Sequence, residues 1–405
     1  MVIRIGIIGK TNTGKTTFFN SATMQSSEVS TYPFTTKKPN VGRAYVISLC
    51  VHREFRVKDN PQNSLCIEGW RYIPIELIDL PGLIKGAWLG KGLGNQFLSV
   101  AAQSDALIHV VDSSGSIDAE GRITSPGTGD PLADLADIEE EVIMWYLKLL
   151  EGNFDKIVRN IKTGTNITQA MVEIFGGIGV KENHVKISLK ETDLEGKDIE
   201  NWNMDDKKKF VTNLREISKP TLIVANKMDL PYAEDNFKRI VEKYKDIIIV
   251  PASAEAELTL RKAEQAKLIK YHPSDERFEI VKGAKLNERQ RWALNYIKSF
   301  VFEKYLRTGV QFALNVAVFK LLRMNVVYPV YDPNKLSDKK GNILPDAFLL
   351  PAGSQVKDLA HIIHSDLAKG LIYAIDAKTG LRLPVNYEIK DRDVLSLVST
   401  TIKRS

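Results

Sequence analysis

The sequence predicts an α/β protein with a mostly parallel sheet, a helical insertion within that sheet, and a smaller C-terminal α+β module. Three observations predict this fold. Continuous apolar runs alternate with helix-compatible segments, a glycine-rich turn directly follows the first run, and the hydrophobic pattern changes at residue 310. Continuous apolar strands separated by helices are typical of a parallel sheet that helices cover on both faces. With 405 residues, the chain is long enough for two or three domains.

The strands expected in the sheet are short apolar runs. They are Val2–Ile8, residues 41–51, Tyr72–Ile78, Ala106–Val111, Thr221–Ala225 and Ile247–Val250. The second and third are interpreted as a strand pair joined by a polar segment. Residues 1–112 and 219–307 therefore form the predicted sheet domain, in which residues 255–307 are a helical extension.

Residues 113–218 interrupt this alternation and are predicted to be a helical insertion. Asp130 is a typical N-cap residue, and Pro131 occupies the first helical position. An apolar stripe with helical spacing follows, made of Leu135, Ile138, Val142, Trp145 and Leu149. Residues 168–175 and 205–218 have the pattern of further helices. We expect the stripe to pack within the insertion.

Residues 310–405 are predicted to form a compact α+β module of ordinary domain size. This module carries 13 Lys and Arg against 9 Asp and Glu, in a chain whose net charge is +6. A basic module is compatible with a nucleic-acid partner, and equally with an ordinary solvated surface.

The composition excludes several classes of protein. The chain is 43% hydrophobic and 26% charged, as globular proteins usually are. It has no apolar stretch near the length of a membrane span and no secretory signal pattern at its N-terminus. Its two cysteines, Cys50 and Cys66, are too few for a disulfide framework and are interpreted as ordinary half-buried side chains. We expect a cytoplasmic protein that does not bind membranes.

The glycine-rich turn, residues 9–16, matches G-x-x-x-x-G-K-[ST] at every defined position and follows a strand, as this phosphate-binding motif requires. Its glycines let backbone N–H groups converge on phosphate oxygens. Lys15 supplies a positive charge for the β- and γ-phosphates, and the Thr16 hydroxyl is a ligand for Mg²⁺. The predicted phosphate-binding residues are Gly9, Asn12, Thr13, Gly14, Lys15, Thr16 and Thr17.

The segment Asn226-Lys227-Met228-Asp229 follows another expected strand and matches N-K-x-D, the guanine-reading motif of GTPases. The Asp229 carboxylate accepts hydrogen bonds from guanine N1–H and the N2 amino group. Adenine lacks this donor pair and would leave the carboxylate desolvated and unpaired. Lys227 can lay its aliphatic stem over the base, and Ser253-Ala254 can offer a backbone N–H to guanine O6. The sequence therefore predicts GTP in preference to ATP.

Two further segments are expected to respond to the γ-phosphate. Asp79 and Gly82 fit D-x-x-G, in which the aspartate holds Mg²⁺ through water and the glycine N–H contacts the γ-phosphate. The segment Tyr32–Thr36 offers a second threonine ligand for Mg²⁺, for which we favour Thr36 over Thr35. These are the loops that order on GTP and relax on hydrolysis. Lys15, Thr36 and Gly82 are accordingly predicted to act in hydrolysis.

Many GTPases place a water-orienting glutamine after the D-x-x-G glycine, but this chain has Leu83, which cannot hydrogen-bond to water. Asn12 is a candidate for holding K⁺ beside the phosphates, or for stabilising the turn alone. His109 is a candidate catalytic residue that a loop movement would bring to the attacking water, or a buried core histidine.

Residues 79–112, with the glycine-rich stretch Gly86–Gly94, closely resemble the Obg-related P-loop GTPases. The order of GTPase domain, helical insertion and C-terminal module is similar to the YchF or Obg-like ATPase subfamily, with the DRG group as the alternative. Residues 349–367 and 387–394 resemble a TGS domain, a ubiquitin-like α+β fold. Many YchF-type proteins replace N-K-x-D with a sequence that tolerates ATP. This chain keeps Asn226, Lys227 and Asp229, so we expect GTP.

The resemblance implies an Mg²⁺-dependent GTPase that acts as a slow switch and contacts the ribosome or another RNA through its TGS domain. Two alternatives stay open. The chain could be a nucleotide-sensing scaffold that regulates a protein partner, or a YchF-type protein that hydrolyses ATP. The oligomeric state is not predicted.

Overall fold

The computed structural model describes residues 2–25, 39–80, 82, 86 and 103–400. The predicted segment Tyr32–Thr36, with Thr35 and Thr36, and Leu83 lie outside the described residues. Within them, no helix is both long and apolar enough to cross a membrane.

The chain divides into two compact units, which we describe separately. The sheet unit comprises Arg4–Gly42 and Glu76–Ala313. The C-terminal unit comprises Met1–Ile3, Arg43–Ile75 and Leu314–Ser405.

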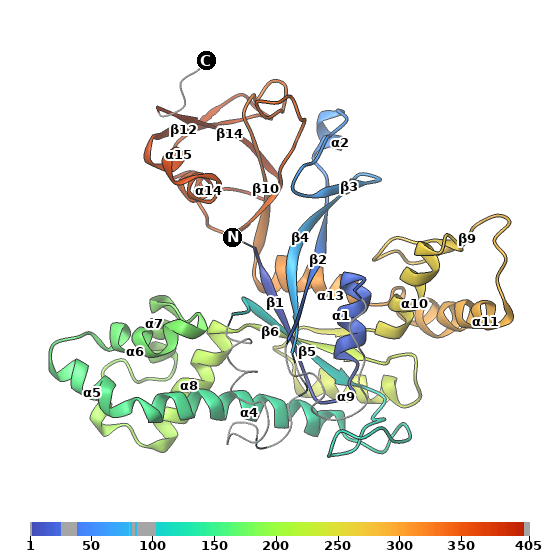
Figure 1. Ribbon diagram of the computed structural model, residues 1–405. Coiled ribbons are helices and arrows are strands. Elements are labelled where there is room, and N and C mark those ends of the chain that lie inside the picture. Colours follow the sequence, from blue (N-terminus) through green and yellow to red (C-terminus); the bar gives the residue numbers. More distant parts are fainter. Residues whose placement is uncertain (1, 26–38, 81, 83–85, 87–102, 401–405) are drawn as a thin grey trace. The chain divides into compact units, whose positions relative to one another are not determined.

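A seven-stranded sheet has the order β2-β4-β1-β5-β6-β7, with β3 added beside β4 (Figure 1). Its strands are β1 (Arg4–Ile8), β2 (Asn40–Leu49), β3 (Leu65–Ile67), β4 (Trp70–Asp79), β5 (Ala106–Asp112), β6 (Thr221–Asn226) and β7 (Ile249–Pro251). β1 pairs in parallel with β4 and β5, β5 with β6, and β6 with β7. The predicted parallel sheet is therefore confirmed. Its carboxyl ends meet at one edge, where ligands bind in sheets of this kind.

Outside the predicted insertion, the sheet unit includes the helices α1 (Lys15–Thr23), α9 (Ala233–Lys243) and α10 (Ala254–Gln265). Beyond them, α11 (Glu288–Ile297), a π-helical turn (Lys298–Phe302) and α12 (Glu303–Tyr305) follow a small antiparallel pair, β8 (Ile269–Lys270) and β9 (Glu279–Ile280). This region has its own apolar core, which includes Leu260, Tyr271, Leu294 and Phe302.

The segment predicted as an insertion is helical. Its helices are α4 (Pro131–Gly152), α5 (Phe154–Lys162), α6 (Ile167–Phe175), α7 (Glu182–Glu191) and α8 (Met204–Ser218), with 3-10 turns at Gly176–Ile178 and Ile199–Asn201. The Asp130 side chain accepts a hydrogen bond from the Leu132 N–H, as an N-cap does. Ile138 and Val142 of the predicted stripe are buried in one apolar cluster, with Trp145 and Leu149 packed against it. The stripe is therefore core, but the expected packing within the insertion alone is wrong. The same cluster contains Ile8 and Leu107 of the sheet, and Leu135 packs in another cluster with Val111 and Ile223.

The C-terminal unit contains a five-stranded sheet of order β11-β10-β14-β12-β13. Its elements are β10 (Met324–Val330), β11 (Phe348–Pro351), α14 (Val356–Ile363), α15 (Ser365–Lys369), β12 (Leu371–Asp376), β13 (Arg382–Leu383) and β14 (Asp393–Ser399). They follow α13 (Val310–Asn315) and a π-helical segment (Val316–Leu321). Leu359 of α14 packs with Val327, Leu350 and Leu395 in the core of this module. The predicted α+β class is confirmed.

The compact units do not follow the predicted domain boundaries. Residues 43–75, which contain α2 (His52–Phe55) and β3, group with the C-terminal residues instead of the nucleotide loops. The Asn60 N–H donates to Ile343 O at 2.8 Å, and the Ala347 N–H donates to Asn63 Oδ1 at 3.0 Å. Such bonds join residues some 280 positions apart, so local sequence patterns carry no trace of them.

Candidate functional site

The loop predicted to bind phosphate, residues 9–16, has the curled backbone that its sequence predicts. Gly9, Asn12 and Gly14 all have positive φ angles, of 144°, 65° and 97°. A Cβ atom at Gly9 would lie 2.3 Å from Val110 O, so no larger residue fits there. α1 begins at Lys15, directly after the loop. The positive end of this helix and its unpaired N–H groups therefore face the loop, as an anion site requires.

Lys15 points back into this loop. Its ammonium donates to Lys10 O at 2.6 Å, and the side chain is buried. Desolvation lowers the pKa of Lys15 to about 8, against the opposing effect of the nearby Asp79 charge. An arriving phosphate anion would favour the charged form. The loop thus holds a cation close to where the sequence places the phosphates.

Thr16 and Asp79 lie together at the ends of α1 and β4. The Thr16 hydroxyl donates to Asp79 Oδ2 at 2.8 Å, and Asn40 Nδ2 lies 3.4 Å from the same oxygen. Burial raises the pKa of Asp79, although Lys15 and these hydrogen bonds oppose the shift. Among the described residues, Asp79 Oδ1 is buried without a hydrogen-bond partner. An orphaned carboxylate oxygen beside a threonine hydroxyl is a donor set that fits Mg²⁺.

Asn226 joins the base-reading loop to the phosphate loop. Its Nδ2 donates to Thr13 O at 2.8 Å, and its Oδ1 accepts from the Ala254 N–H at 3.0 Å. A Cβ atom at Gly14 would lie 2.3 Å from Asn226 Nδ2, so this close approach needs glycine. One side chain therefore sets the spacing between the loops predicted to hold the base and the phosphates.

Asp229 lies beyond β6 and is partly exposed. The Ser253 hydroxyl donates to Asp229 Oδ1 at 2.6 Å, and the Tyr296 hydroxyl donates to Asp229 O at 2.9 Å. The Lys227 ammonium donates to Asp112 Oδ2 at 2.8 Å and to Ser116 Oγ at 3.1 Å. These bonds hold the N-K-x-D loop at the carboxyl edge of the sheet.

The predicted backbone donors to guanine O6 are both engaged within the protein. The Ser253 N–H donates to Thr308 O at 2.8 Å, and the Ala254 N–H donates to Asn226 Oδ1. A contact from Ala254 to the base would therefore have to share or exchange the bond to Asn226.

Three other predicted site residues, Gly82, Thr17 and Asn12, lie in or against the predicted phosphate loop and the start of α1. Gly82 lies against the phosphate loop, because a Cβ atom there would be 2.6 Å from Thr11 Oγ1 and 3.0 Å from the Thr11 N. Thr17 is half-buried in the first turn of α1. Asn12 Nδ2 donates to Gly121 O at 2.9 Å, a bond from the predicted phosphate loop to the loop that precedes α4.

His109 lies within β5, every residue of which is buried. Desolvation, together with the charges of Arg215 and Lys15, lowers the pKa of His109 to about 3. The imidazole is therefore neutral near pH 7. This environment fits the core interpretation, and the catalytic role stays a prediction.

Two acidic residues of α4 reach the nucleotide edge, and sequence reasoning did not identify them. Asp134 Oδ1 accepts from Lys10 Nζ at 2.6 Å, with both side chains buried. Glu141 accepts from the Gly86 N–H, in the segment that follows D-x-x-G. Asp134 and Glu141 lie seven residues apart, which is two helical turns, so they share one face of α4. The sequence did contain a signal for them, because both acidic residues lie on the apolar side of a predicted helix.

Comparisons with known proteins cover almost the whole chain. Three family descriptions match: "50S ribosome-binding GTPase" over residues 4–126, "Obg-like GTPase YGR210-like, G4 motif-containing domain" over 224–332, and "TGS domain" over 339–399. The uncharacterized GTP-binding protein MJ1332 of Methanocaldococcus jannaschii is 46% identical over 98% of both chains. The ribosome-binding ATPase YchF of Buchnera aphidicola is 29% identical, over 92% of this chain and 88% of its own.

A solved structure is also similar over its full length. The crystal structure of a GTP-binding protein from Pyrococcus horikoshii matches with a TM-score of 0.79 and 35% identity, covering 98% of this chain and all of that one.

Proposed function

The chain belongs to the Obg-like, YchF-related family of P-loop GTP-binding proteins with a C-terminal TGS domain, and from this premise we propose that it is a slow, Mg²⁺-dependent GTPase that works as a nucleotide-controlled switch. The observation that carries the proposal is the pair of hydrogen bonds made by the Asn226 side chain. One goes to Thr13 in the predicted phosphate loop, and the other to Ala254 at the start of α10. This link supports the proposal, because it sets the distance between the two loops that would hold the triphosphate and the purine base of one nucleotide.

Guanine preference rests on Asp229. The names of the relatives differ on this point, since one is called a GTP-binding protein and another an ATPase. In this chain the carboxylate of Asp229 is fixed by Ser253, so it is ready to accept the two donors of guanine. Opposite adenine it would lose solvation without gaining a partner.

The magnesium ion is proposed to be held by Thr16, by Thr36, and by Asp79 through water. When bound, the ion supplies positive charge that offsets the charge developing on the β- and γ-phosphate oxygens. The chain's own part is to hold Lys15 and the loop amides against the phosphates, with the Gly82 N–H facing the γ-phosphate. Because Leu83 cannot orient water, hydrolysis needs another aid, and K⁺ beside Asn12 is proposed to supply the charge that an arginine finger provides in other GTPases.

Helix α4 supports a route from nucleotide state to the insertion. Asp134 contacts Lys10 in the phosphate loop, and Glu141 contacts Gly86 after D-x-x-G. A movement of either loop must therefore either break its contact with α4 or move α4 with it.

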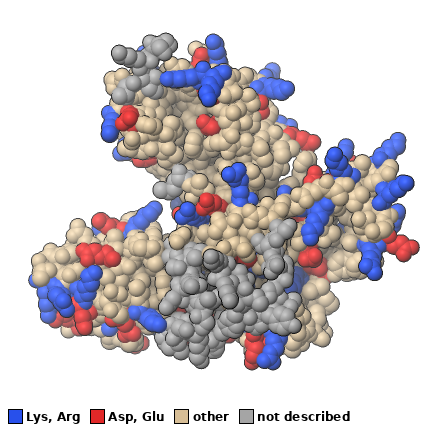
Figure 2. All heavy atoms as spheres, in the orientation of Figure 1, with Lys and Arg blue, Asp and Glu red and all other residues tan. Residues whose placement is uncertain are grey.

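The partner is proposed to be the ribosome or another RNA, met in the cytoplasm through the TGS domain. The support is the relative's name and the family description, together with the slightly basic C-terminal residues. Figure 2 shows basic and acidic side chains interspersed on the visible face of this module, so charge alone does not select RNA. The alternative is a scaffold whose TGS fold binds a protein.

Co-sedimentation separates these alternatives. We expect purified chain to sediment with ribosomal subunits in the presence of a non-hydrolysable GTP analogue and much less with GDP. Sedimentation that ignores the nucleotide, or that is absent in both states, would contradict the switch proposal. Phosphate release with and without Mg²⁺ measures the hydrolysis itself.

A further inference from the structure

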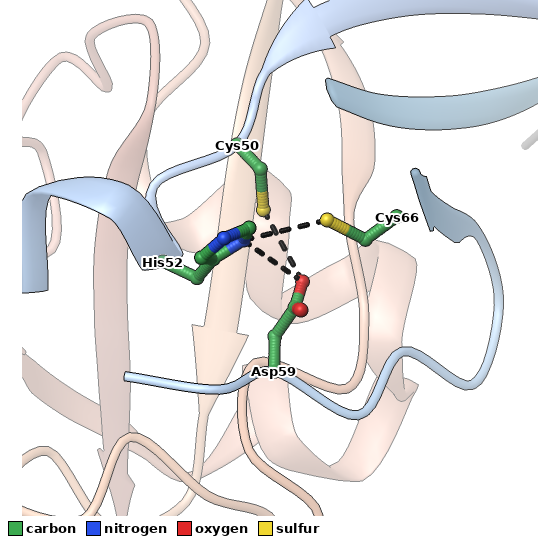
Figure 3. Close-up of side chains that lie close together, drawn as sticks. All are labelled: Cys50, His52, Asp59 and Cys66. Carbon is green, nitrogen blue, oxygen red and sulfur yellow. Dashed lines mark hydrogen bonds and ion pairs between the residues drawn. The ribbon is translucent and has the colours of Figure 1, made fainter. Parts of the chain in front are cut away.

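Four side chains with metal-binding atoms converge in the C-terminal unit, and the nucleotide site uses none of them. Cys50, His52, Asp59 and Cys66 each offer one ligand atom, and all four atoms lie within 4.8 Å of one another. Cys50 follows β2, His52 begins α2, Asp59 lies in the next loop and Cys66 lies in β3. Figure 3 shows the four side chains pointing toward one common centre.

The separations fit one tetrahedral ion. Cys50 Sγ lies 3.3 Å from Asp59 Oδ2, His52 Nδ1 lies 3.4 Å from Cys66 Sγ, and the same Nδ1 lies 3.4 Å from Asp59 Oδ2. Zinc bonds of about 2.3 Å to sulfur and about 2.0–2.2 Å to nitrogen or oxygen give tetrahedral edges of about 3.3–3.8 Å between ligand atoms. The three observed edges therefore match or nearly match those of a zinc tetrahedron.

The chemistry of the donors selects the metal. Two thiols and one imidazole are soft or borderline ligands, which suit Zn²⁺ and do not suit Mg²⁺ or Ca²⁺. We propose that Cys50, His52, Asp59 and Cys66 form a structural zinc site. Four protein ligands leave no open position, so the site is structural and not catalytic.

Charge balance favours the same assignment. Two thiolates and one carboxylate around Zn²⁺ leave one net negative charge. Arg71 is fully buried beside the cluster, with its Nη2 atom 3.2 Å from Asp59 Oδ2. Its guanidinium also donates to Ser64 Oγ at 3.1 Å and to Leu344 O at 2.9 Å, and it lies over the Tyr328 ring. The fold thus places one fixed cation where the occupied site needs one.

Proton release is a consequence. Cysteine binds zinc as the thiolate, whereas an ordinary free thiol carries its proton near pH 7. Zinc must displace that proton in order to bind the sulfur.

The site would fix a loop that has little regular structure of its own. Between α2 and β3, the Asn60 N–H donates to Ile343 O at 2.8 Å and the Gln62 N–H donates to Pro345 O at 2.6 Å. Asp59 precedes these residues and Cys66 follows them. A metal that joins Asp59 and Cys66 to β2 and α2 would therefore hold this loop in place for its contacts with residues 343–345.

The test is the metal content of the full chain, purified without chelator, measured by elemental analysis. We expect one zinc per chain, lost in Cys50→Ser and Cys66→Ser and retained in the control His361→Gln, an exposed histidine outside the cluster. Thiol titration should find both cysteines protected until a strong chelator is added. Equal zinc in wild type and Cys66→Ser would overturn the proposal.

A second measurement does not depend on whether the variants fold. Wild-type chain stripped of metal and titrated with Co²⁺ should show a thiolate-to-cobalt charge-transfer band and the intense visible bands of tetrahedral cobalt, saturating at one equivalent, with release of protons. If instead the spectrum is that of hydrated cobalt, or intact mass finds a Cys50–Cys66 disulfide in chain prepared under reducing conditions, the proposal fails.

Discussion

Lys10 Nζ lies 2.6 Å from Asp134 Oδ1, and both side chains are about 8% exposed. This buried pair joins the phosphate loop to the first helix of the insertion. Burial raises the pKa of Asp134, while the hydrogen bond and charge of Lys10 oppose the shift. The buried ammonium of Lys10 therefore depends on the Asp134 carboxylate of α4 as its counter-charge.

Replacing Asp134 with Asn is expected to destabilise the protein, because it leaves a buried ammonium without its counter-charge. Losing one partner of a buried pair costs about 3–5 kcal/mol of unfolding free energy. Urea unfolding measures this cost. The control is Glu234→Gln, which breaks an exposed pair with Lys238 and should leave the free energy of unfolding nearly unchanged. Equal effects of the two substitutions would show that the Lys10 pair adds nothing.

Asp79→Asn should separate magnesium binding from folding. Because burial raises the pKa of Asp79, a neutral isostere is expected to keep or slightly increase the melting temperature of the nucleotide-free protein. GTP turnover should fall about 100-fold or more, since Asp79, which is proposed to hold the ion through water, loses its charge. Turnover across a Mg²⁺ titration measures this. Unchanged magnesium dependence in the variant would rule out the role given to Asp79.

Nucleotide affinity is expected to fall as the pH rises past about 8. Desolvation lowers the pKa of Lys15 to about 8 in the free protein. Bound phosphates favour the charged ammonium, so binding above that pH takes up a proton and weakens by up to about tenfold per pH unit. Below that pH the ammonium is already charged and this dependence vanishes. Calorimetry in buffers of different ionisation enthalpy counts the proton. In Lys15→Met the uptake should be absent, and if it persists another group is responsible.

Potassium should stimulate hydrolysis if Asn12 helps to hold the ion. We expect faster GTP turnover in K⁺ than in Na⁺ at equal ionic strength, with the difference lost in Asn12→Ala. Asn12 Nδ2 donates to Gly121 O, so the variant's melting temperature must be compared with that of wild type. Equal rates in the two salts would rule out the potassium role proposed for Asn12.

The parts of the fold that could be predicted from sequence are those encoded locally. The strand before Gly9, the N-cap at Asp130 and the stripe through Val142 are patterns within a few residues, and each is found where it was expected. The nucleotide motifs share one edge because the parallel pairing of β1, β4, β5 and β6 brings their carboxyl ends together.

Contacts between distant residues could not be predicted in this way. The pair Lys10–Asp134 and the bonds of Asn60 and Asn63 to residues 343 and 347 depend on packing across more than 100 positions. Cys50 and Cys66 were interpreted as ordinary side chains, because two cysteines alone do not make a framework. Their meaning changes only when the fold brings His52 and Asp59 beside them.

Purine selectivity tests the central claim most directly. Calorimetric titration of wild-type chain and Asp229→Asn with GTP, ATP and xanthosine triphosphate is the measurement, with Asp235→Asn, an exposed carboxylate of α9, as the matched control. We predict that wild type binds GTP at least about 100-fold more tightly than ATP. Asp229→Asn should weaken GTP and strengthen xanthosine triphosphate, whose O2 accepts from the new amide, while Asp235→Asn behaves as wild type. Binding of ATP by wild type as tightly as GTP would contradict the account.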